Sequence, residues 1–247
     1  MSKRFKGKPC VYCCVDGISE TGDHVIARRF FLEQRRANLP QVPACMKCNG
    51  KKGDLETYLM SVLPFGGRHP DALDNLKNLV PPRLGKNQKL HRQLNAGASP
   101  IWSIESSGLA VPTTSLPLDG EKLEKLFEYI VRGLMWYHWG VLLAKDCVVE
   151  VMTPGSKIQK VFDDMHRQRA HARLNENLGN GTFVYRATQG VDNLQVSIWE
   201  FSMYGCMHLA DAPAFPGEVL SRICAITGPA RIFESASAAS TVDLILR

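Results

Sequence analysis

The sequence lacks the features that would assign it to a membrane or a secreted class. Its 247 residues contain no run of about 18 uncharged apolar residues, the length that a transmembrane helix needs. The basic N-terminal segment has no apolar core of the kind found in signal peptides. The eight cysteines have no regular spacing, which excludes a disulfide scaffold. We therefore expect a cytoplasmic protein with reduced cysteines and no membrane partner.

Acidic residues are scarce in the first part of the chain. Residues 1–100 hold 17 Lys and Arg against 8 Asp and Glu, a net charge of +9. Residues 101–247 hold 13 against 16, a net charge of −3. Concentrated Lys and Arg are typical of a nucleic-acid surface, because cations that neutralise phosphates release counterions. The asymmetry predicts that the first hundred residues bind nucleic acid, with DNA as the expected partner and RNA left open.

Four of the cysteines form two Cys-x-x-Cys pairs. Cys10 pairs with Cys13, and Cys45 pairs with Cys48. This spacing lets both thiolates of a pair reach one tetrahedral Zn²⁺. A site with four protein ligands is closed to water, so the zinc is expected to be structural and not catalytic. Cys14 is an alternative ligand to Cys13, although Cys10-x-x-Cys13 has the commoner spacing.

The segment between the two pairs is long enough to contain further structure. It holds 31 residues, more than the roughly 15 to 20 of a simple zinc ribbon. Asp23 and His24 lie inside it, after a turn-like stretch and before Val25-Ile26, a sequence typical of a short strand. We therefore expect the Asp-His pair on a hairpin. Asn49 directly follows the last cysteine of the second pair, on a helix expected from about Met46.

These residues resemble the HNH, or ββα-metal, endonuclease family, in its subgroup with four zinc-binding cysteines. The match consists of Asp23-His24 followed by Cys45-x-x-Cys48-Asn49-x-x-Lys52-Gly53-Asp54. The resemblance implies a β-hairpin that carries Asp23 and His24, followed by a helix that carries Asn49. It also implies that His24 is the general base, and that Asp23 and Asn49 bind a catalytic Mg²⁺ or Mn²⁺.

The chemistry of these residue types agrees with that implication. Hydrolysis of a phosphodiester needs a base that titrates near neutrality, and the ordinary pKa of histidine is about 6.5. Mg²⁺ prefers oxygen ligands and retains several waters, so one carboxylate and one amide oxygen suffice. The sequence thus separates two metals by ligand type, with sulfurs for structural zinc and oxygens for the catalytic ion.

The chain departs from the family pattern at two positions. Ala27 stands where the family often has a proline. The family's middle asparagine, which orients the base, has no clear counterpart; Asn38 is a weak candidate, and a backbone carbonyl is the alternative. The cations nearest to the expected catalytic residues are the candidate phosphate contacts, namely Arg28, Arg29, Lys51 and Lys52.

The expected fold class is α+β, with a small zinc-stapled ββα-metal (HNH) unit followed by helices and a separate α+β domain. Residues 1–96 are expected to form a basic HNH nuclease domain with its zinc staple. Residues 97–247 are expected to form the α+β domain, which would select a substrate or bind a protein partner. Its predicted elements are helices over 121–139 and about 156–174, and strands over 147–152, 183–188, 195–204 and 221–227.

Two functions from different classes remain. The first is a metal-dependent endonuclease that hydrolyses DNA, and the second is a non-catalytic, zinc-dependent nucleic-acid-binding protein. The combination of Asp23, His24 and Asn49 favours the enzyme, because a binding protein needs neither a base nor two oxygen ligands there.

Overall fold

The structure is a computed structural model that describes residues 4–67, 69–104, 109–153, 156–205, 222–231 and 233. Its class is mixed α+β, which confirms the coarse prediction. The strands are β1 (Thr21–His24), β2 (Gln41–Ala44), β3 (Ser99–Ile104), β4 (Ala110–Ser115), β5 (Cys147–Met152), β6 (Ala172–Leu178), β7 (Phe183–Gln189), β8 (Ser197–Met203) and β9 (Ile223–Pro229). The α-helices are α1 (Met46–Val62), α2 (Pro70–Asp74), α3 (Val80–Lys86), α4 (Gln88–Gly97), α5 (Gly120–Trp139) and α6 (Ser156–Met165). Short 3-10 helices η1 (Arg28–Phe30), η2 (Glu33–Arg35) and η3 (Leu63–Gly66) and a π-helical turn η4 (Asn75–Leu79) complete the described elements.

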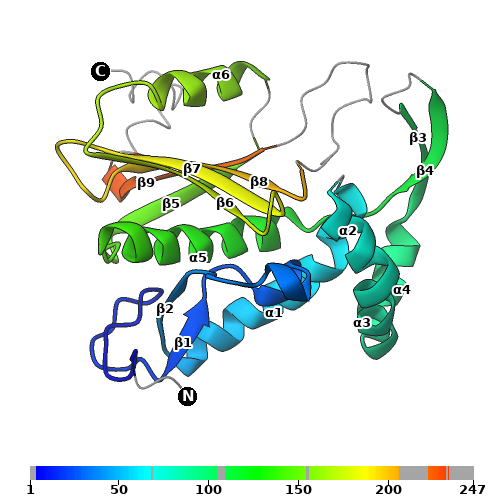
Figure 1. Ribbon diagram of the computed structural model, residues 1–247, viewed down its shortest axis with the longest axis horizontal. Coiled ribbons are helices and arrows are strands. Elements are labelled where there is room, and N and C mark those ends of the chain that lie inside the picture. The colour runs from blue at the N-terminus through cyan, green and yellow to red at the C-terminus, as the bar shows by residue number, and fades with distance from the viewer. Residues whose placement is uncertain are drawn as a thin grey trace.

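A five-stranded antiparallel sheet, in the order β5-β9-β8-β7-β6, forms the largest element of the molecule. Successive side chains along each strand point to opposite faces of the sheet. Tyr185, Trp199 and Phe201 lie on the face against α5 and are at most 1% exposed. Ile198 and Ile226 lie on the other face, against α6. The sheet is therefore covered by one helix on each side (Figure 1).

Helix α5 begins and ends where its sequence predicts. Asp119 is the N-cap, and its carboxylate accepts a hydrogen bond from the backbone N–H of Lys122. Gly140 ends the helix in the left-handed conformation at φ +67°, which glycine adopts without strain. The apolar positions between them form a fully buried stripe: Leu126, Phe127, Ile130, Val131 and Leu134.

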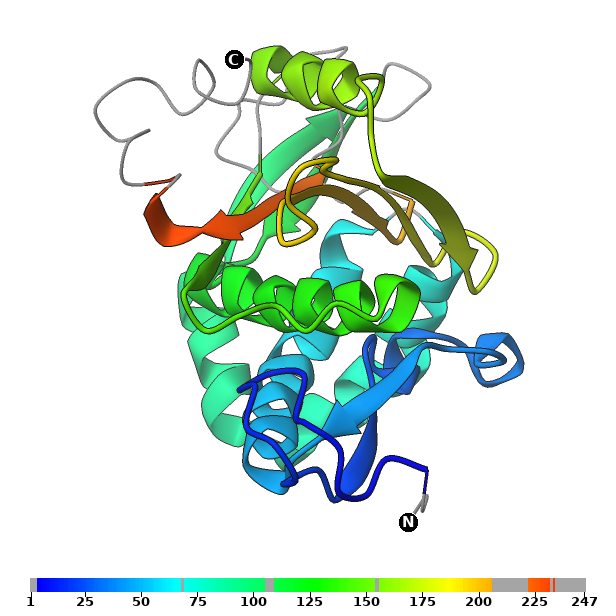
Figure 2. The same cartoon turned by 90° about the vertical axis from the view of Figure 1, so that its left-hand side faces the viewer.

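The opposite side of α5 packs against the first strands and α1. Gly133 is the point of closest approach, since a Cβ built there would lie 2.9 Å from the side chain of Val25. Figure 2 shows α5 between the sheet and the N-terminal hairpin with its helix. One hydrophobic cluster contains Val42 of β2, Ile130 of α5 and Phe201 of β8. Helix α5 thus contributes to the core on both sides, and the domain boundary near residue 97 stays a prediction.

One segment differs from its predicted form. Helix α6 ends at Met165, and Ala172–Leu178 form strand β6 instead of the rest of a helix ending near Leu174. The segment alternates half-buried and exposed residues, which is the period of a strand. Gly179, Asn180 and Gly181 follow with φ values of +63°, +56° and +92° and make the turn into β7. Ser221, at the start of another expected strand, lies outside the described residues.

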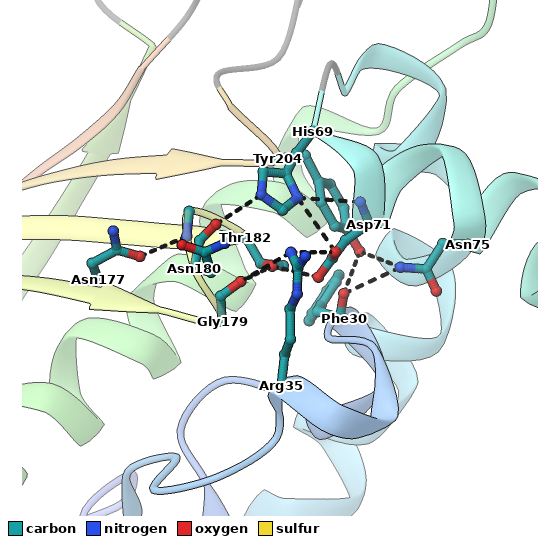
Figure 3. Close-up of polar contacts among 11 residues, drawn as sticks. Phe30, Arg35, His69, Asp71, Asn75, Asn177, Gly179, Asn180, Thr182 and Tyr204 are labelled. Carbon is teal, nitrogen blue, oxygen red and sulfur yellow. Dashed lines mark hydrogen bonds and ion pairs between the residues drawn. The ribbon is translucent and has the colours of Figure 1, made fainter.

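A buried polar junction joins the connection between β1 and β2 to α2 and to the β6–β7 turn (Figure 3). Asp71 is fully buried, and its carboxylate binds Arg35 at 2.7 Å and the Thr182 hydroxyl at 2.5 Å. The hydroxyl of Tyr204 donates to the backbone carbonyl of Phe30 at 2.9 Å. These bonds fix the base of the β1–β2 connection. Among the described residues, no helix is both long and apolar enough to cross a membrane.

Candidate metal and catalytic site

The four cysteines of the two Cys-x-x-Cys pairs come together in the structure. The sulfur atoms of Cys10, Cys13, Cys45 and Cys48 all lie within 4.8 Å of one another. Sulfurs bound at about 2.3 Å to a tetrahedral zinc ion are separated by about 3.8 Å, so the cluster fits the ion after a small contraction. The structure confirms the predicted grouping of these cysteines, which can hold one Zn²⁺.

Backbone groups support this cysteine cluster. The N–H of Cys45 donates to the sulfur of Cys10, and the N–H of Cys48 donates to the sulfur of Cys45, both at 3.4 Å. Cys45 is also the N-cap of α1, so the second pair occupies the first turn of that helix. Cys14 has a φ of +56° and its thiol donates to the carbonyl of Leu143 at 2.9 Å. Cys13, and not Cys14, is therefore the fourth member of the cluster.

The Asp-His pair ends strand β1, as the sequence predicts for a hairpin. β1 and β2 are antiparallel, with Thr21 opposite Ala44 and His24 opposite Gln41. Two contacts join helix α1 to β1. The amide of Asn49 donates to the Thr21 hydroxyl at 3.2 Å, and the ammonium of Lys52 donates to the backbone carbonyl of His24 at 2.8 Å. The chain order is strand, strand, helix, with the candidate residues on β1 and on the face of α1 beside it.

Toward the residues that the structure describes, Asp23 uses only one of its two carboxylate oxygens. Oδ2 accepts the hydroxyl of Tyr12 at 2.5 Å and lies 3.0 Å from the ammonium of Lys52. No described residue donates a hydrogen bond to Oδ1. Tyr12 is itself packed edge-on against Tyr129 of α5, with ring centroids 5.0 Å apart. The carboxylate is thus held from one side, and its second oxygen remains available as a ligand.

Lys52 is the centre of a buried charge cluster. The residue is 0% exposed, and its ammonium also forms an ion pair with Glu56, one turn later on α1. Burial raises the pKa of Glu56 to about 6, while the neighbouring Lys52 opposes that rise. Burial and the adjacent carboxylate of Asp23 raise the pKa of Tyr12, so its hydroxyl remains a donor. The sequence suggested a phosphate contact for Lys52, but a fully buried ammonium with three oxygen partners does not reach solvent.

Asn49 presents its amide oxygen without a protein partner. Its Nδ2 is used by Thr21, and no described residue donates to its Oδ1. Asn49 is half-buried and Asp23 is buried. One carboxylate oxygen and one amide oxygen are the ligand types that Mg²⁺ and Mn²⁺ prefer. The donor set therefore fits a divalent oxygen-binding ion, at the two residues that the sequence predicts.

His24 is half-buried, and one of its ring nitrogens is engaged by Gln41. The amide nitrogen of Gln41 donates to Nε2 of His24 at 2.7 Å, while no hydrogen bond between described residues involves Nδ1. Burial lowers the pKa of His24, and the positive charges of Arg28 and Lys52 lower it further, against an opposing effect of Asp23. The ring is therefore neutral at pH 7, with its lone pair on Nε2, where the Gln41 amide donates, and its proton on Nδ1.

Gln41 is the contact that the sequence did not reveal. Asn38, the weak candidate for orienting the base, is exposed at φ +57°, and no hydrogen bond between described residues joins it to His24. Gln41 is instead opposite His24 in the β1–β2 register. Its only sequence signal is its place at the start of β2, which identifies the partner of His24 once the register is known.

The remaining candidate cations lie at the surface. Arg28, Arg29 and Lys51 are exposed. Arg83 of α3 donates to the backbone carbonyls of Arg29, at 3.4 Å, and of Met60, at 2.9 Å. This contact places the α3–α4 segment next to η1. Residues 75–104 contain no Asp or Glu, and the exposed cations of that segment are Lys77, Lys86, Lys89 and Arg92.

Comparison of the chain with protein-family models, with characterised proteins and with solved structures finds no match. The resemblance to HNH endonucleases therefore depends on the motif residues alone. What the structure adds is the cysteine cluster and the environment of each candidate side chain.

Proposed function

We propose that this protein is a metal-dependent endonuclease of the HNH type that hydrolyses phosphodiester bonds of DNA. The observation that carries the proposal is the unequal use of the Asp23 carboxylate. Tyr12 and Lys52 both hold Oδ2, and no described residue donates to Oδ1. Asn49, on the helix that contacts β1, also has an amide oxygen to which no described residue donates, and the neighbouring His24 has a lowered pKa. A purely structural acid in a buried site generally has both oxygens satisfied.

In this proposal Asp23 and Asn49 would hold Mg²⁺ or Mn²⁺ through their side-chain oxygens. The ion, when bound, would neutralise the negative charge that grows on the phosphate and on the leaving oxygen. The cysteine-bound zinc has a separate role, because four thiolates leave it no open position. Zinc would maintain the first turn of α1, which carries both Cys48 and Asn49.

His24 would act as the general base through Nε2. Because the amide nitrogen of Gln41 donates to Nε2, the neutral ring carries its lone pair on Nε2 and its proton on Nδ1. Gln41 is therefore a positioning residue that fixes the tautomer and the orientation of the ring. Nε2 would take a proton from a water molecule that displaces the Gln41 amide. As this happens, the water oxygen would bond to phosphorus, and the bond from phosphorus to the leaving oxygen would break.

The exposed cations would bind the nucleic-acid backbone. Arg28 and Arg29 lie four and five residues after His24, and the acid-free α3–α4 segment adjoins them through Arg83. A cationic surface that begins at the site and continues along two helices suits an extended polyanion. The sheet and its two helices would select the substrate or a protein partner.

The alternative is a zinc-dependent nucleic-acid-binding protein without catalysis. One observation favours it: the charge of Asp23 is already balanced by the buried ammonium of Lys52. In this case the Lys52 cluster would only stabilise the packing of α1 against β1. The two functions predict the same zinc content and similar DNA affinity, and they differ in cleavage.

Incubation of purified protein with plasmid DNA across a titration of Mg²⁺ and Mn²⁺ separates the two functions. The wild-type protein should nick or linearise the plasmid, and His24→Ala should reduce the rate by ~10² to 10⁴, the usual contribution of a general base. The variant should keep its zinc and its DNA affinity. Equal cleavage by the two proteins would assign the activity to another site, and no cleavage by either would favour the binding protein.

A further inference from the structure

Three oxygen atoms surround the ammonium of Lys52. Oδ2 of Asp23 lies at 3.0 Å, the backbone carbonyl oxygen of His24 lies at 2.8 Å, and the carboxylate of Glu56 forms the third contact. Two carboxylates and a carbonyl are also a typical oxygen set for a divalent cation. The ammonium of Lys52 thus occupies the position at which these three oxygens would otherwise attract a metal cation.

This ammonium opposes a second cation at the same carboxylate. A divalent ion on Oδ1 of Asp23 would be separated from the Lys52 charge by one carboxylate group, in a region where water is largely excluded. At such distances and reduced dielectric, the repulsion between the two cations is substantial. Asp23 and Glu56 share the charge of Lys52, so the ammonium offsets part of the attraction between the Asp23 carboxylate and a second cation.

A nucleic-acid phosphate changes this charge balance. It brings a negative charge and further oxygen ligands to an ion that Asp23 and Asn49 alone would bind with few contacts. Ion and phosphate therefore favour each other at the site, and by linkage each raises the affinity of the other. The phosphate thus adds negative charge to the ion-binding oxygens of the complex, and this charge offsets the repulsion from Lys52.

We propose that Lys52 is a built-in cation that keeps the affinity of the Asp23 site for divalent ions low in the free protein. The ion is then recruited together with the phosphodiester. This inference rests on the proposed function, since it concerns the ion that Asp23 and Asn49 would hold. It assigns to Lys52 a regulatory role in place of a phosphate contact.

Manganese binding to the full-length protein without DNA tests the proposal. Electron paramagnetic resonance of free Mn²⁺ would be measured for the wild type, for Lys52→Met and for Lys51→Met. Lys52→Met should bind Mn²⁺ roughly tenfold more tightly or better, because removal of one adjacent charge is worth at least that factor. Lys51→Met is the matched control: it removes the neighbouring exposed cation of the same helix and should change the affinity little. Equal or weaker binding by Lys52→Met would overturn the proposal.

A second variant keeps the test valid if Lys52→Met does not fold, which its zinc content and thermal unfolding would reveal. Glu56→Gln removes a negative charge while Lys52 stays, so it should weaken Mn²⁺ binding several-fold. An unchanged affinity in Glu56→Gln would contradict the charge argument. In the His24→Ala background, where a short DNA duplex should remain uncut, the duplex should tighten Mn²⁺ binding more in the presence of Lys52 than in Lys52→Met.

Failure of this inference and failure of the proposed function give different results. A wild type that cleaves DNA, with no gain of Mn²⁺ affinity in Lys52→Met, removes the role of Lys52 and keeps the nuclease. A clear gain of affinity, with no cleavage by the wild type under any metal condition, keeps the charge argument and removes the nuclease.

Discussion

Two buried carboxylates of this protein are paired with cations in different ways. Glu200, on the face of the sheet against α6, uses both of its oxygens. Oε1 accepts from Arg222 at 2.7 Å and from Arg186 at 3.1 Å, and Oε2 accepts from Arg186 at 2.8 Å and from Gln159 of α6 at 2.5 Å. Among the described residues, only Oδ2 of Asp23 has partners. Both oxygens of Glu200 are therefore hydrogen-bonded, whereas one oxygen of Asp23 accepts no hydrogen bond from a described residue.

The cations differ as well. A guanidinium is planar and has several donors, so Arg186 contacts both oxygens of Glu200 and also pairs with Asp163 of α6. The Arg186 and Arg222 side chains are about one third exposed, at 33% and 36%. The ammonium of Lys52 is a compact charge that is fully buried. The Glu200 cluster therefore ties α6 to the sheet, while the Asp23 cluster leaves a ligand atom free. A buried carboxylate with cationic partners thus holds a helix in place at Glu200, whereas at Asp23 it would also suit the proposed metal ion.

The largest effect on structure and cleavage is expected when the zinc that stabilises the hairpin of Asp23 is removed. Cys45→Ser should lose the zinc, because metal binding and folding are coupled in such sites and are together worth about 10 kcal/mol. The hairpin and α1 should then lose their structure and cleavage should disappear. Metal analysis and circular dichroism measure both losses. Cys14→Ser is the matched control, since that thiol contacts Leu143 and not the cluster. A folded Cys45→Ser protein with unchanged zinc would contradict this assignment.

The next prediction exchanges one carboxylate at a time for an amide. Asp23→Asn should reduce cleavage by at least tenfold at low Mg²⁺, and the defect should shrink as Mg²⁺ or Mn²⁺ is raised. Its stability should change less, because Lys52 keeps Glu56 as a partner. Glu200→Gln should show the reverse: a loss of roughly 2 kcal/mol, because two partly exposed guanidinium groups lose their counter-charge, and little change in cleavage per folded molecule.

Urea unfolding measures the stability of Asp23→Asn and Glu200→Gln, and cleavage across a metal titration measures the activity of each variant. The comparison between the two carboxylates breaks down if Glu200→Gln shows the metal-dependent defect, or if Asp23→Asn is the variant that loses more stability.

The same comparison explains how much the sequence could predict. The cysteine cluster was predictable because the spacing within each Cys-x-x-Cys pair is local and limits the geometry directly. Helix α5 was predictable because its apolar stripe has an N-cap at Asp119 and a terminal Gly140. Both signals lie within one short stretch of chain.

Features that depend on long-range contacts could not be predicted in this way. Lys52 was expected to contact phosphate because it lies near the expected catalytic residues in the sequence. Its burial depends instead on Asp23, 29 positions earlier in the sequence. Gln41 was missed because its contact with His24 follows from a strand register that the intervening connection does not encode locally. The first residues of β6, up to about Leu174, were taken for helix because the alternation of the strand is short and follows the apolar residues of α6, although Gly179 and Asn180 mark a turn.

A carboxylate added beside His24 should raise the pKa of the ring and leave the ring able to act as a base. In the proposed mechanism activity requires neutral His24, so the rate falls as pH decreases through the pKa of that ring. Burial and Arg28 lower this pKa below the ordinary value, so the wild type should keep its activity at about pH 6.5. Gln41→Glu places a negative charge at Nε2 and should raise the pKa, moving the loss of activity to higher pH by about one unit. The rate on the alkaline plateau should be almost unchanged, and an unshifted profile would show that Gln41 does not hold the base.

The smallest effect is expected on DNA affinity, from single exposed arginines of the two regions. Arg28 is exposed next to the candidate site, whereas Arg167 beyond α6 is exposed and paired with Asp164 at 3.2 Å. Arg28→Ala should weaken DNA binding a few-fold and reduce the slope of log affinity against log salt by about one unit, the value for one lost phosphate contact. Arg167→Ala should leave the slope unchanged. Fluorescence anisotropy with a labelled duplex at several salt concentrations measures both. A loss of slope in Arg167→Ala equal to that in Arg28→Ala would move the DNA-binding surface to the α6 side of the sheet, because the slope counts phosphate contacts wherever they occur.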